Sequence, residues 1–228
     1  MTNIRYLGHA SWELSDGTTT VLVDPWLTGN PKAPVSADEL SANAILLTHG
    51  HEDHYGDTIS IAKRTGAPVL AIVELAGEIA GILGEGHDVR NPNIGGTVEF
   101  DWGWVRLTPA WHTGTSPNGT VHTPAGLVVH FAGTTIYFVG DSALFSDLAL
   151  PGKRNPIDVA VIPIGGHFTM DRHDAVEAAK LIGAPTVIPS HFNTFPPVAT
   201  DAQAFKADVE SATSSKVVVL EPGETHST

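Results

Sequence analysis

The segment LLTHGHEDHYGD, residues 46–57, concentrates imidazole and carboxylate side chains directly after the apolar run AILL. Four candidate ligands lie within six residues: His49, His51, Asp53 and His54. Imidazole and carboxylate groups bind divalent cations such as Zn²⁺, Mn²⁺, Fe²⁺ and Ni²⁺. A single tetrahedral ion does not take four ligands from one short loop, so the spacing favours two neighbouring cations. The alternative, a polar surface loop, does not account for the H-x-H-x-D-H crowding.

Three more candidates follow predicted strands elsewhere in the chain. His112 follows the run LTPAW, Asp141 follows YFVG, and His191 follows TVIPS. The carboxyl ends of strands are where open sheets place their sites. Each residue alone is more typical of a structural side chain. Together with the first cluster they complete a two-metal site, because a carboxylate can bridge two cations.

Composition excludes several classes of protein. The chain has 228 residues and no cysteine, which excludes disulfides, iron–sulfur clusters, thiolate zinc sites and cysteine nucleophiles. A formal net charge of −13 and the absence of a Lys/Arg run disfavour nucleic acid as a partner. The first residues lack a basic, apolar leader, and no run approaches the roughly 18 apolar residues of a membrane span. We therefore expect a cytoplasmic protein with a small-molecule substrate and no membrane partner; a homo-oligomer is compatible with these features.

The elements that position the candidate ligands occur twice. The pattern D-x4-A-K-x2-G-A-P starts at Asp57 and again at Asp174, 117 positions later, and Asp24 and Asp141 stand the same distance apart. Each copy predicts a helix that begins after its aspartate and ends at Gly66 or Gly183, followed by a strand. The alternative explanation is that both copies only share a sequence that is common where a helix ends and a strand follows.

The repeat predicts one α+β domain over residues 1–228, with two similar halves of about 1–115 and 118–228. Each half contains short buried strands such as TTVLV and TTIYFV, with a helix that packs outside them. Two such halves form two sheets face to face with helices outside, a four-layer αββα sandwich.

The order H-x-H-x-D-H, lone histidine, aspartate, lone histidine resembles the ligand order of the metallo-β-lactamase superfamily over essentially the whole chain. The strings GHAS, DPWLTGNP, PIGGHFTM and SHFNTFPP resemble a bacterial and archaeal group of uncharacterised metal-dependent hydrolases. That group is similar to the L-ascorbate-6-phosphate lactonases. The resemblance implies the same αββα sandwich that the internal repeat predicts.

The resemblance also implies a ligand set. A first metal would be held by His49, His51 and His112, a second by Asp53, His54 and His191, and Asp141 would bridge the two. These ligands suit two divalent ions, Zn²⁺ or Mn²⁺ in the first place, and are compatible with Ni²⁺ or Fe²⁺. A bridging hydroxide would attack a small ester, lactone or phosphodiester. Asp53 would also orient the hydroxide or accept a proton.

Other residues are candidates for contact with the substrate. His9 lies at a predicted bend between strands, and His167 lies in the repeat-equivalent of the metal loop. The repeat therefore predicts that His167 faces the site from the opposite half, as a substrate contact or proton donor. Asn193 and Thr194 are further candidates because they follow a candidate ligand. The remaining histidines are expected to be structural: His87, His122, His130, His173 and His226.

Two other functions are compatible with the same scaffold. An RNA-processing nuclease is disfavoured by the acidic charge and by the lack of a basic insertion resembling the tRNA-clamping arm of that branch. A redox or metal-sensing protein is disfavoured because the flavodiiron branch typically has an acidic ligand at the position of His51 and a fused flavin domain. A binuclear metal-dependent hydrolase is therefore the function that the sequence favours.

Overall fold

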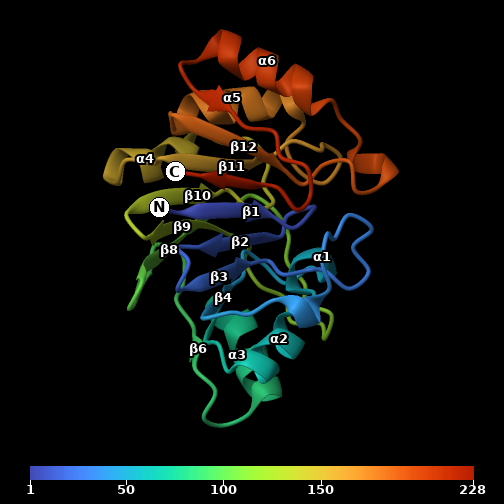
Figure 1. Cartoon of the computed structure of the whole chain (residues 1–228), viewed down its shortest axis with the longest axis vertical. Coiled ribbons are helices and arrows are strands. Elements are labelled where there is room, and N and C mark those ends of the chain that lie inside the picture. The colour runs from blue at the N-terminus through green and yellow to red at the C-terminus, as the bar shows by residue number, and fades with distance from the viewer.

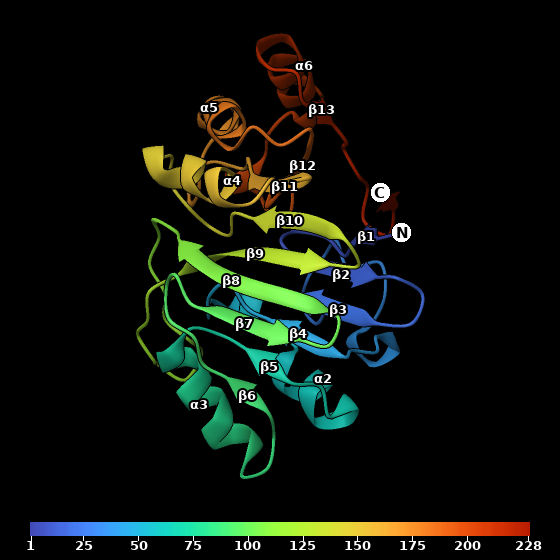
Figure 2. The same cartoon turned by 90° about the vertical axis from the view of Figure 1, so that its left-hand side faces the viewer.

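Two seven-stranded sheets lie between outer helices in the computed structural model, which describes the whole chain. In Figure 1, α5 (Arg172–Ile182) and α6 (Ala202–Ala212) lie above the sheets, and α2 (Thr58–Thr65) and α3 (Val73–Leu83) lie below them. Figure 2 shows α4 (Leu150–Arg154) on the same side as α5. This arrangement confirms the predicted αββα sandwich.

The first sheet takes its strands mainly from the first third of the chain. Its strands, in spatial order, are β14 (Thr225–Ser227), β1 (Asn3–Tyr6), β2 (Trp12–Ser15), β3 (Thr20–Val23), β4 (Ala44–Leu46), β5 (Val69–Leu70) and β6 (Val89–Arg90). Pairing is antiparallel from β14 to β3 and parallel from β3 to β6.

The second sheet repeats this order. Its strands are β7 (Thr97–Phe100), β8 (Gly103–Pro109), β9 (Ala125–Phe131), β10 (Thr134–Phe138), β11 (Val159–Pro163), β12 (Thr186–Ser190) and β13 (Lys216–Val217). Pairing is antiparallel from β7 to β10 and parallel from β10 to β13. The sheets do not divide the chain at residues 115–118, because β7 and β8 precede that point and β14 returns to the first sheet. A duplicated origin of the two halves stays a prediction.

The remaining elements are short. They are α1 (Glu52–Tyr55) and three turns of 3₁₀ helix at Ala37–Glu39, Ser146–Ala149 and Pro196–Val198. None of the helices is both long and apolar enough to cross a membrane.

Strands of the second sheet bury side chains on both of their faces. On β9, Leu127 and Val129 join the core between the sheets, whereas Val128 joins the core beneath α5 and α6. On β11, Val161 points to the first core and Ala160 to the second. Successive side chains of a strand point to opposite faces, so a strand covered on both sides is apolar throughout. This explains the continuous apolar runs that precede the candidate ligands.

The helix ends follow the sequence pattern with one correction. Both helices of the repeat end as predicted, at Gly66 and Gly183, whose left-handed φ angles of 73° and 68° suit glycine. The start of α2 after Asp57 is also confirmed. The predicted start of α5 after Asp174 is wrong, because the helix begins at Arg172.

Asp171 is the reason for the earlier start of α5. Its carboxylate accepts hydrogen bonds from the backbone N–H groups of His173 (2.8 Å) and Asp174 (2.9 Å). These donors have no partner within the helix, so the capping carboxylate stabilises the first turn. Asp174 therefore lies inside the first turn and does not precede it.

We expect Asp171→Ala to destabilise the protein, because the two N–H groups lose their acceptor. A lost cap of this kind costs about 1 kcal/mol, which lowers the melting temperature of a chain of this size by roughly 2–4 °C. Thermal unfolding followed by circular dichroism measures the effect. Asp174→Ala is the matched control and should change the melting temperature less; the opposite ranking would place the cap at Asp174.

Candidate metal centre

All seven candidate ligands lie together at one edge of the sandwich, although four separate segments carry them. The loop after β4 and helix α1 carry His49, His51, Asp53 and His54. The loops after β8, β10 and β12 carry the others: His112, Asp141 and His191. In Figure 1 this edge is on the side of α1, and the two chain termini lie at the other side of the molecule.

One set consists of three histidines. The ligand atoms of His49, His51 and His112 all lie within 4.8 Å of one another. The Nε2 atom of His49 is 3.0 Å from the Nδ1 atom of His51. His49 is fully buried, whereas His51 and His112 are half-buried, so this set is open to solvent on one side.

The second set combines a carboxylate with histidines. Asp53, His54, His191 and, in addition, His9 bring their ligand atoms within 4.8 Å of one another. The Oδ2 atom of Asp53 is 3.7 Å from Nε2 of His191 and 4.0 Å from Nε2 of His54. The sequence did not predict that His9 would join this set.

Asp141 lies between the two sets. Its Oδ2 atom is 3.1 Å from Nε2 of His191 and 3.4 Å from Nε2 of His54. The same oxygen is 3.6 Å from Nε2 of His112 and 4.0 Å from Nε2 of His49. Asp141 is buried, and one carboxylate oxygen is therefore near ligand atoms of both sets.

The geometry fits divalent cations. Ligand atoms bound at about 2.0–2.2 Å to a tetrahedral ion stand roughly 3.3–3.6 Å from one another, close to the separations found here. The Nε2 atoms of His54 and His191 are buried and have no hydrogen-bond partner. Buried polar atoms without partners are rare and costly in a folded protein, so a bound cation accounts for them.

Asp24 fixes the orientation of His54, a role that the sequence did not reveal. Its Oδ2 atom accepts a hydrogen bond from Nδ1 of His54 at 2.8 Å. Because Nδ1 carries the proton, Nε2 of the neutral ring keeps its lone pair for a metal. Asp24 also accepts hydrogen bonds from Thr48, at 2.8 Å from its backbone N–H and 2.6 Å from its hydroxyl.

Thr48 extends this network to His49. Since its hydroxyl hydrogen is donated to Asp24, its oxygen is free to accept a hydrogen bond from Nδ1 of His49, 3.1 Å away. The Nε2 atom of His49 is then the unprotonated nitrogen, and it points toward the other ligands. One buried aspartate thus sets the tautomers of two histidines.

His9 holds Asp53. Its Nε2 atom donates to Oδ2 of Asp53 at 2.9 Å, and its Nδ1 atom lies 2.8 Å from the hydroxyl of Thr194. Burial lowers the pKa of His9 to about 4, although the contact with Asp53 opposes the shift. The ring is therefore neutral, and Nδ1 accepts a hydrogen bond from Thr194. The structure thus brings together His9 and Thr194, both of which the sequence singled out.

His122 is bound to the metal loop, although its sequence position indicated only a structural residue. Its Nε2 atom accepts a hydrogen bond from the backbone N–H of Gly50 at 2.9 Å, between His49 and His51. The contact requires glycine, because a Cβ atom at position 50 would lie 2.8 Å from the ring of His122. The link joins the loop that carries His49 to the segment that follows His112.

Burial lowers the pKa values of the histidines in the cluster, whereas neighbouring carboxylates raise them. Burial lowers the pKa of His49 well below its ordinary value, and His54 adds to the shift. Burial also lowers the pKa of His191. The negative charge of Asp141 and its side-chain contact with His191 outweigh burial and raise the pKa of His191 to about 9. Asp141 and Asp53 likewise raise the pKa of His54 against the effect of burial. Protons on these rings balance the buried carboxylates, and divalent cations would replace those protons.

Several residues around the cluster have a left-handed backbone. The φ angles are 60° at His9, 47° at Asp24, 53° at His191 and 56° at Asn193. Side chains other than glycine rarely adopt this region, and such residues concentrate at functional sites. The backbone at these positions is therefore held by the surrounding packing and hydrogen bonds.

His167 lies near this edge but apart from the cluster. It follows β11 in the loop that the repeat predicted, and it shares the left-handed backbone with a φ angle of 60°. Its side chain is exposed, and its ring packs at right angles on Phe168, 4.4 Å between centroids. His167 belongs to none of the ligand groups, and its contact with substrate stays a prediction.

Comparison with known proteins gives consistent matches. A model of the beta-lactamase superfamily domain matches residues 3–191. A UPF0173 metal-dependent hydrolase of Shouchella clausii is 46% identical over 228 residues, which cover 97% of this chain and 98% of that protein. One of Pelotomaculum thermopropionicum is 43% identical over 226 residues, 97% of each chain. The solved structure of Igni18, a metallo hydrolase from the archaeon Ignicoccus hospitalis, is 35% identical with a TM-score of 0.88 and covers 99% of this chain and 97% of its own.

We expect His122→Ala to weaken divalent metal binding without unfolding the protein, because the metal loop loses the acceptor for the Gly50 N–H. The loss of a group that orients metal ligands typically reduces affinity by about 10–100-fold. Competition with a chromogenic chelator measures the affinity. His130→Ala is the control, since His130 is half-buried and stacks on Trp104 away from the cluster. Equal affinities of both variants would show that His122 does not position the loop.

The metal-free protein should lose stability as the pH rises. Below about pH 6.5 His191 is protonated in both the folded and unfolded states, so its attraction to Asp141 contributes fully. Between that value and the raised pKa of about 9 only the folded state keeps the proton, and the contribution is lost as the pH passes through this range. Melting temperatures of chelator-treated protein measure the decline.

The metal-loaded protein is the control for this decline. Its melting temperature should fall less over the same range, because a cation takes the place of the proton and binds deprotonated ligands more tightly. Parallel curves for the chelated and loaded protein would contradict the exchange of protons for metal.

Proposed function

The chain belongs to the metallo-β-lactamase superfamily, among its metal-dependent hydrolases, and we propose that it hydrolyses a small ester, lactone or phosphodiester with two divalent cations. The observation that carries the proposal is the position of Asp141, whose Oδ2 atom lies within 4.0 Å of Nε2 atoms in both ligand sets. A carboxylate in this position would bridge two ions.

Each ligand set would hold one cation. The first would bind His49, His51 and His112, and the second would bind Asp53, His54 and His191. Imidazole and carboxylate ligands favour Zn²⁺ or Mn²⁺ and accept Ni²⁺ or Fe²⁺. Cations bound there would supply the Lewis acidity that activates a water molecule and polarises a carbonyl or phosphoryl oxygen.

Asp53 and His9 would act as a pair. Burial opposes ionisation of Asp53, but His54, His191 and His9 lower its pKa far below the ordinary value. Asp53 is also the carboxylate of the cluster that is open to solvent, with 28% of its side chain exposed. It is thus placed to orient a water molecule, while the hydrogen bond from His9 holds its carboxylate in one orientation. We propose that His9 is a positioning residue.

The solvent-exposed side of the cluster and the nearby loop of His167 are consistent with a small-molecule substrate. His51, Asp53 and His112 form the solvent-exposed side of the cluster, so a scissile group can approach from that side. We propose that His167, exposed on the loop after β11, contacts the bound substrate or donates a proton to the leaving group.

Metal content and hydrolysis test the proposal together. Protein reconstituted with excess Zn²⁺ or Mn²⁺ should contain two ions per chain by elemental analysis. It should hydrolyse at least one member of a panel of lactones, esters and phosphodiesters. Asp141→Ala should lose one ion and reduce turnover by more than about 100-fold, because it removes a ligand from both sets.

Asp147→Ala is the matched control, since Asp147 is exposed and belongs to neither ligand set. It should keep both ions and full turnover. A wild-type protein with one ion, or an Asp141→Ala variant with two ions and normal turnover, would overturn the two-metal assignment.

A further inference from the structure

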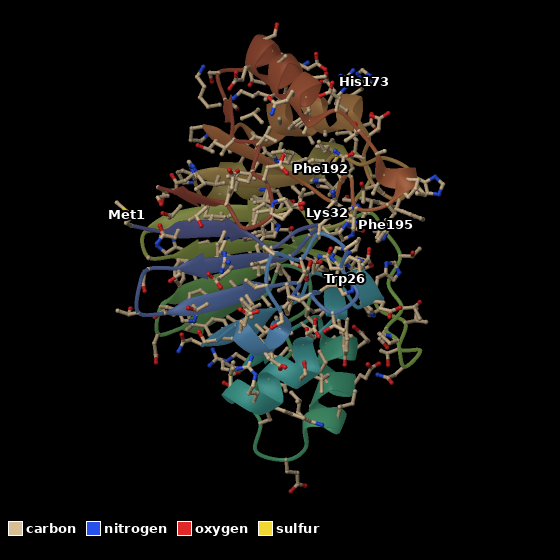
Figure 3. All side chains as sticks on the ribbon, turned by 45° about the vertical axis from the view of Figure 1, so that its right-hand side comes forward. Met1, Trp26, Lys32, His173, Phe192 and Phe195 are labelled. Carbon is tan, nitrogen blue, oxygen red and sulfur yellow. The ribbon has the colours of Figure 1, made fainter.

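A hollow of about 380 Å³ adjoins the candidate metal centre at Asp53. The residues that line it are Trp26, Thr28, Gly29, Glu52, Asp53 and Phe195. Asp53 belongs to the ligand set, so a molecule with its scissile group at the cluster can extend into this hollow. Figure 3 shows Trp26 and Phe195 on the same face of the molecule.

Two aromatic rings form its walls. The ring centroids of Trp26 and Phe195 are 6.1 Å apart, and both rings pack on His9, at 5.3 and 5.2 Å. Because His9 also donates to Asp53, the aromatic walls are joined directly to the metal-binding carboxylate. Concave sites with aromatic walls beside a few polar groups are typical of small-molecule binding.

Hydrogen bonds fix the backbone of the segment that carries Trp26. The carboxylate of Asp57 accepts hydrogen bonds of 2.8 Å from the backbone N–H groups of Leu27 and Thr28. The backbone N–H of Trp26 donates to the hydroxyl of Ser11 at 3.0 Å. A Cβ atom at Gly56 would lie 2.5 Å from Cα of Trp26, so the loop packs closely on α1. The hollow is therefore formed before a ligand binds, which reduces the entropic cost of binding.

Glu52 is the charged side chain of the hollow that would stay uncompensated when Asp53 holds a cation. Glu52 and Asp53 line it, and neither Lys nor Arg does. The carboxylate of Glu52 is exposed. Lys32 lines a separate hollow with Tyr6 and Phe192. The exposed charge of Glu52 would disfavour a phosphate or carboxylate group between the aromatic walls, whereas an uncharged apolar group would bury surface there.

We infer that this hollow binds the apolar, uncharged substituent of a carbonyl ester or lactone, and that substrates with an anionic substituent there are disfavoured. The inference rests on the proposed hydrolysis and narrows its substrate class. In the reaction, the oxygen of water bonds to the carbonyl carbon, the ester C–O bond breaks, and the alcohol leaves with a proton. No oxidant or reductant takes part.

Binding can be tested without turnover. Ligand-observed NMR with phenylacetamide, a neutral aromatic probe, should show contact with the wild-type protein. Trp26→Ala and Phe195→Ala should each remove most of the signal. Phe100→Ala is the matched control for Phe195→Ala, because Phe100 is also half-buried and also lines a surface hollow, but away from the cluster.

Kinetics test the charge preference. The substrates para-nitrophenyl valerate and para-nitrophenyl hemiglutarate share a leaving group and chain length and differ in one terminal carboxylate. The metal-loaded protein should prefer the valerate, and Phe195→Ala should lower kcat/KM for it by about tenfold, mostly through KM. Glu52→Gln should raise kcat/KM for the hemiglutarate by about two- to fivefold, the effect of an exposed charge.

The binding experiment and the kinetic experiment distinguish the role of the hollow in binding from the proposed hydrolysis. Equal phenylacetamide contact in the wild type, Trp26→Ala and Phe195→Ala would overturn the hollow as a binding site, whatever the enzyme hydrolyses. Preference for the hemiglutarate would overturn the charge assignment. Normal phenylacetamide binding with no hydrolysis of any ester or lactone by the two-metal protein would instead overturn the proposed function and the substrate class that depends on it.

Discussion

The carboxylate of Asp141, buried among imidazole rings, is the constraint on which the site depends. A buried charge is costly unless positive charge and hydrogen bonds compensate it, and the ligand atoms of four histidines face this one oxygen. Protons or cations can provide the compensation. The hydrogen bonds of Asp24 and Thr48 leave the Nε2 lone pairs of His54 and His49 available to a cation.

The sandwich brings these groups together because its parallel strands end at one edge. Each ligand segment follows a strand whose side chains are buried on both faces, so the strand cannot shift without exposing apolar surface. His49, His112, Asp141 and His191 each lie within three residues of the end of a strand, so the double sheet holds their positions. A site assembled in this way tolerates little movement of either sheet relative to the other.

The sequence predicted most of the fold and singled out the residues that the structure brings into one cluster, because those features are local. H-x-H-x-D-H is a single loop, and the other ligands follow apolar strands directly. The role of Asp24 was not predictable, because its contact with His54 depends on how β3 and β4 are paired. Likewise, no local pattern shows that His122 reaches Gly50 or that Phe195 faces Trp26. The start of α5 was misplaced because Asp171 and Asp174 both resemble capping residues, and only the structure shows which one accepts the bonds.

The left-handed backbone at His9, Asp24, His191 and Asn193 has a consequence for protein engineering. Glycine would relax each of these positions, so a search for thermostable variants that scores the backbone alone would select it there. Each such substitution would remove a side chain at or beside the cluster, so the relief of backbone strain would come with the loss of that side chain's contacts. Substitutions that raise stability without loss of the site are therefore expected in the loops and helices at the opposite edge of the sandwich.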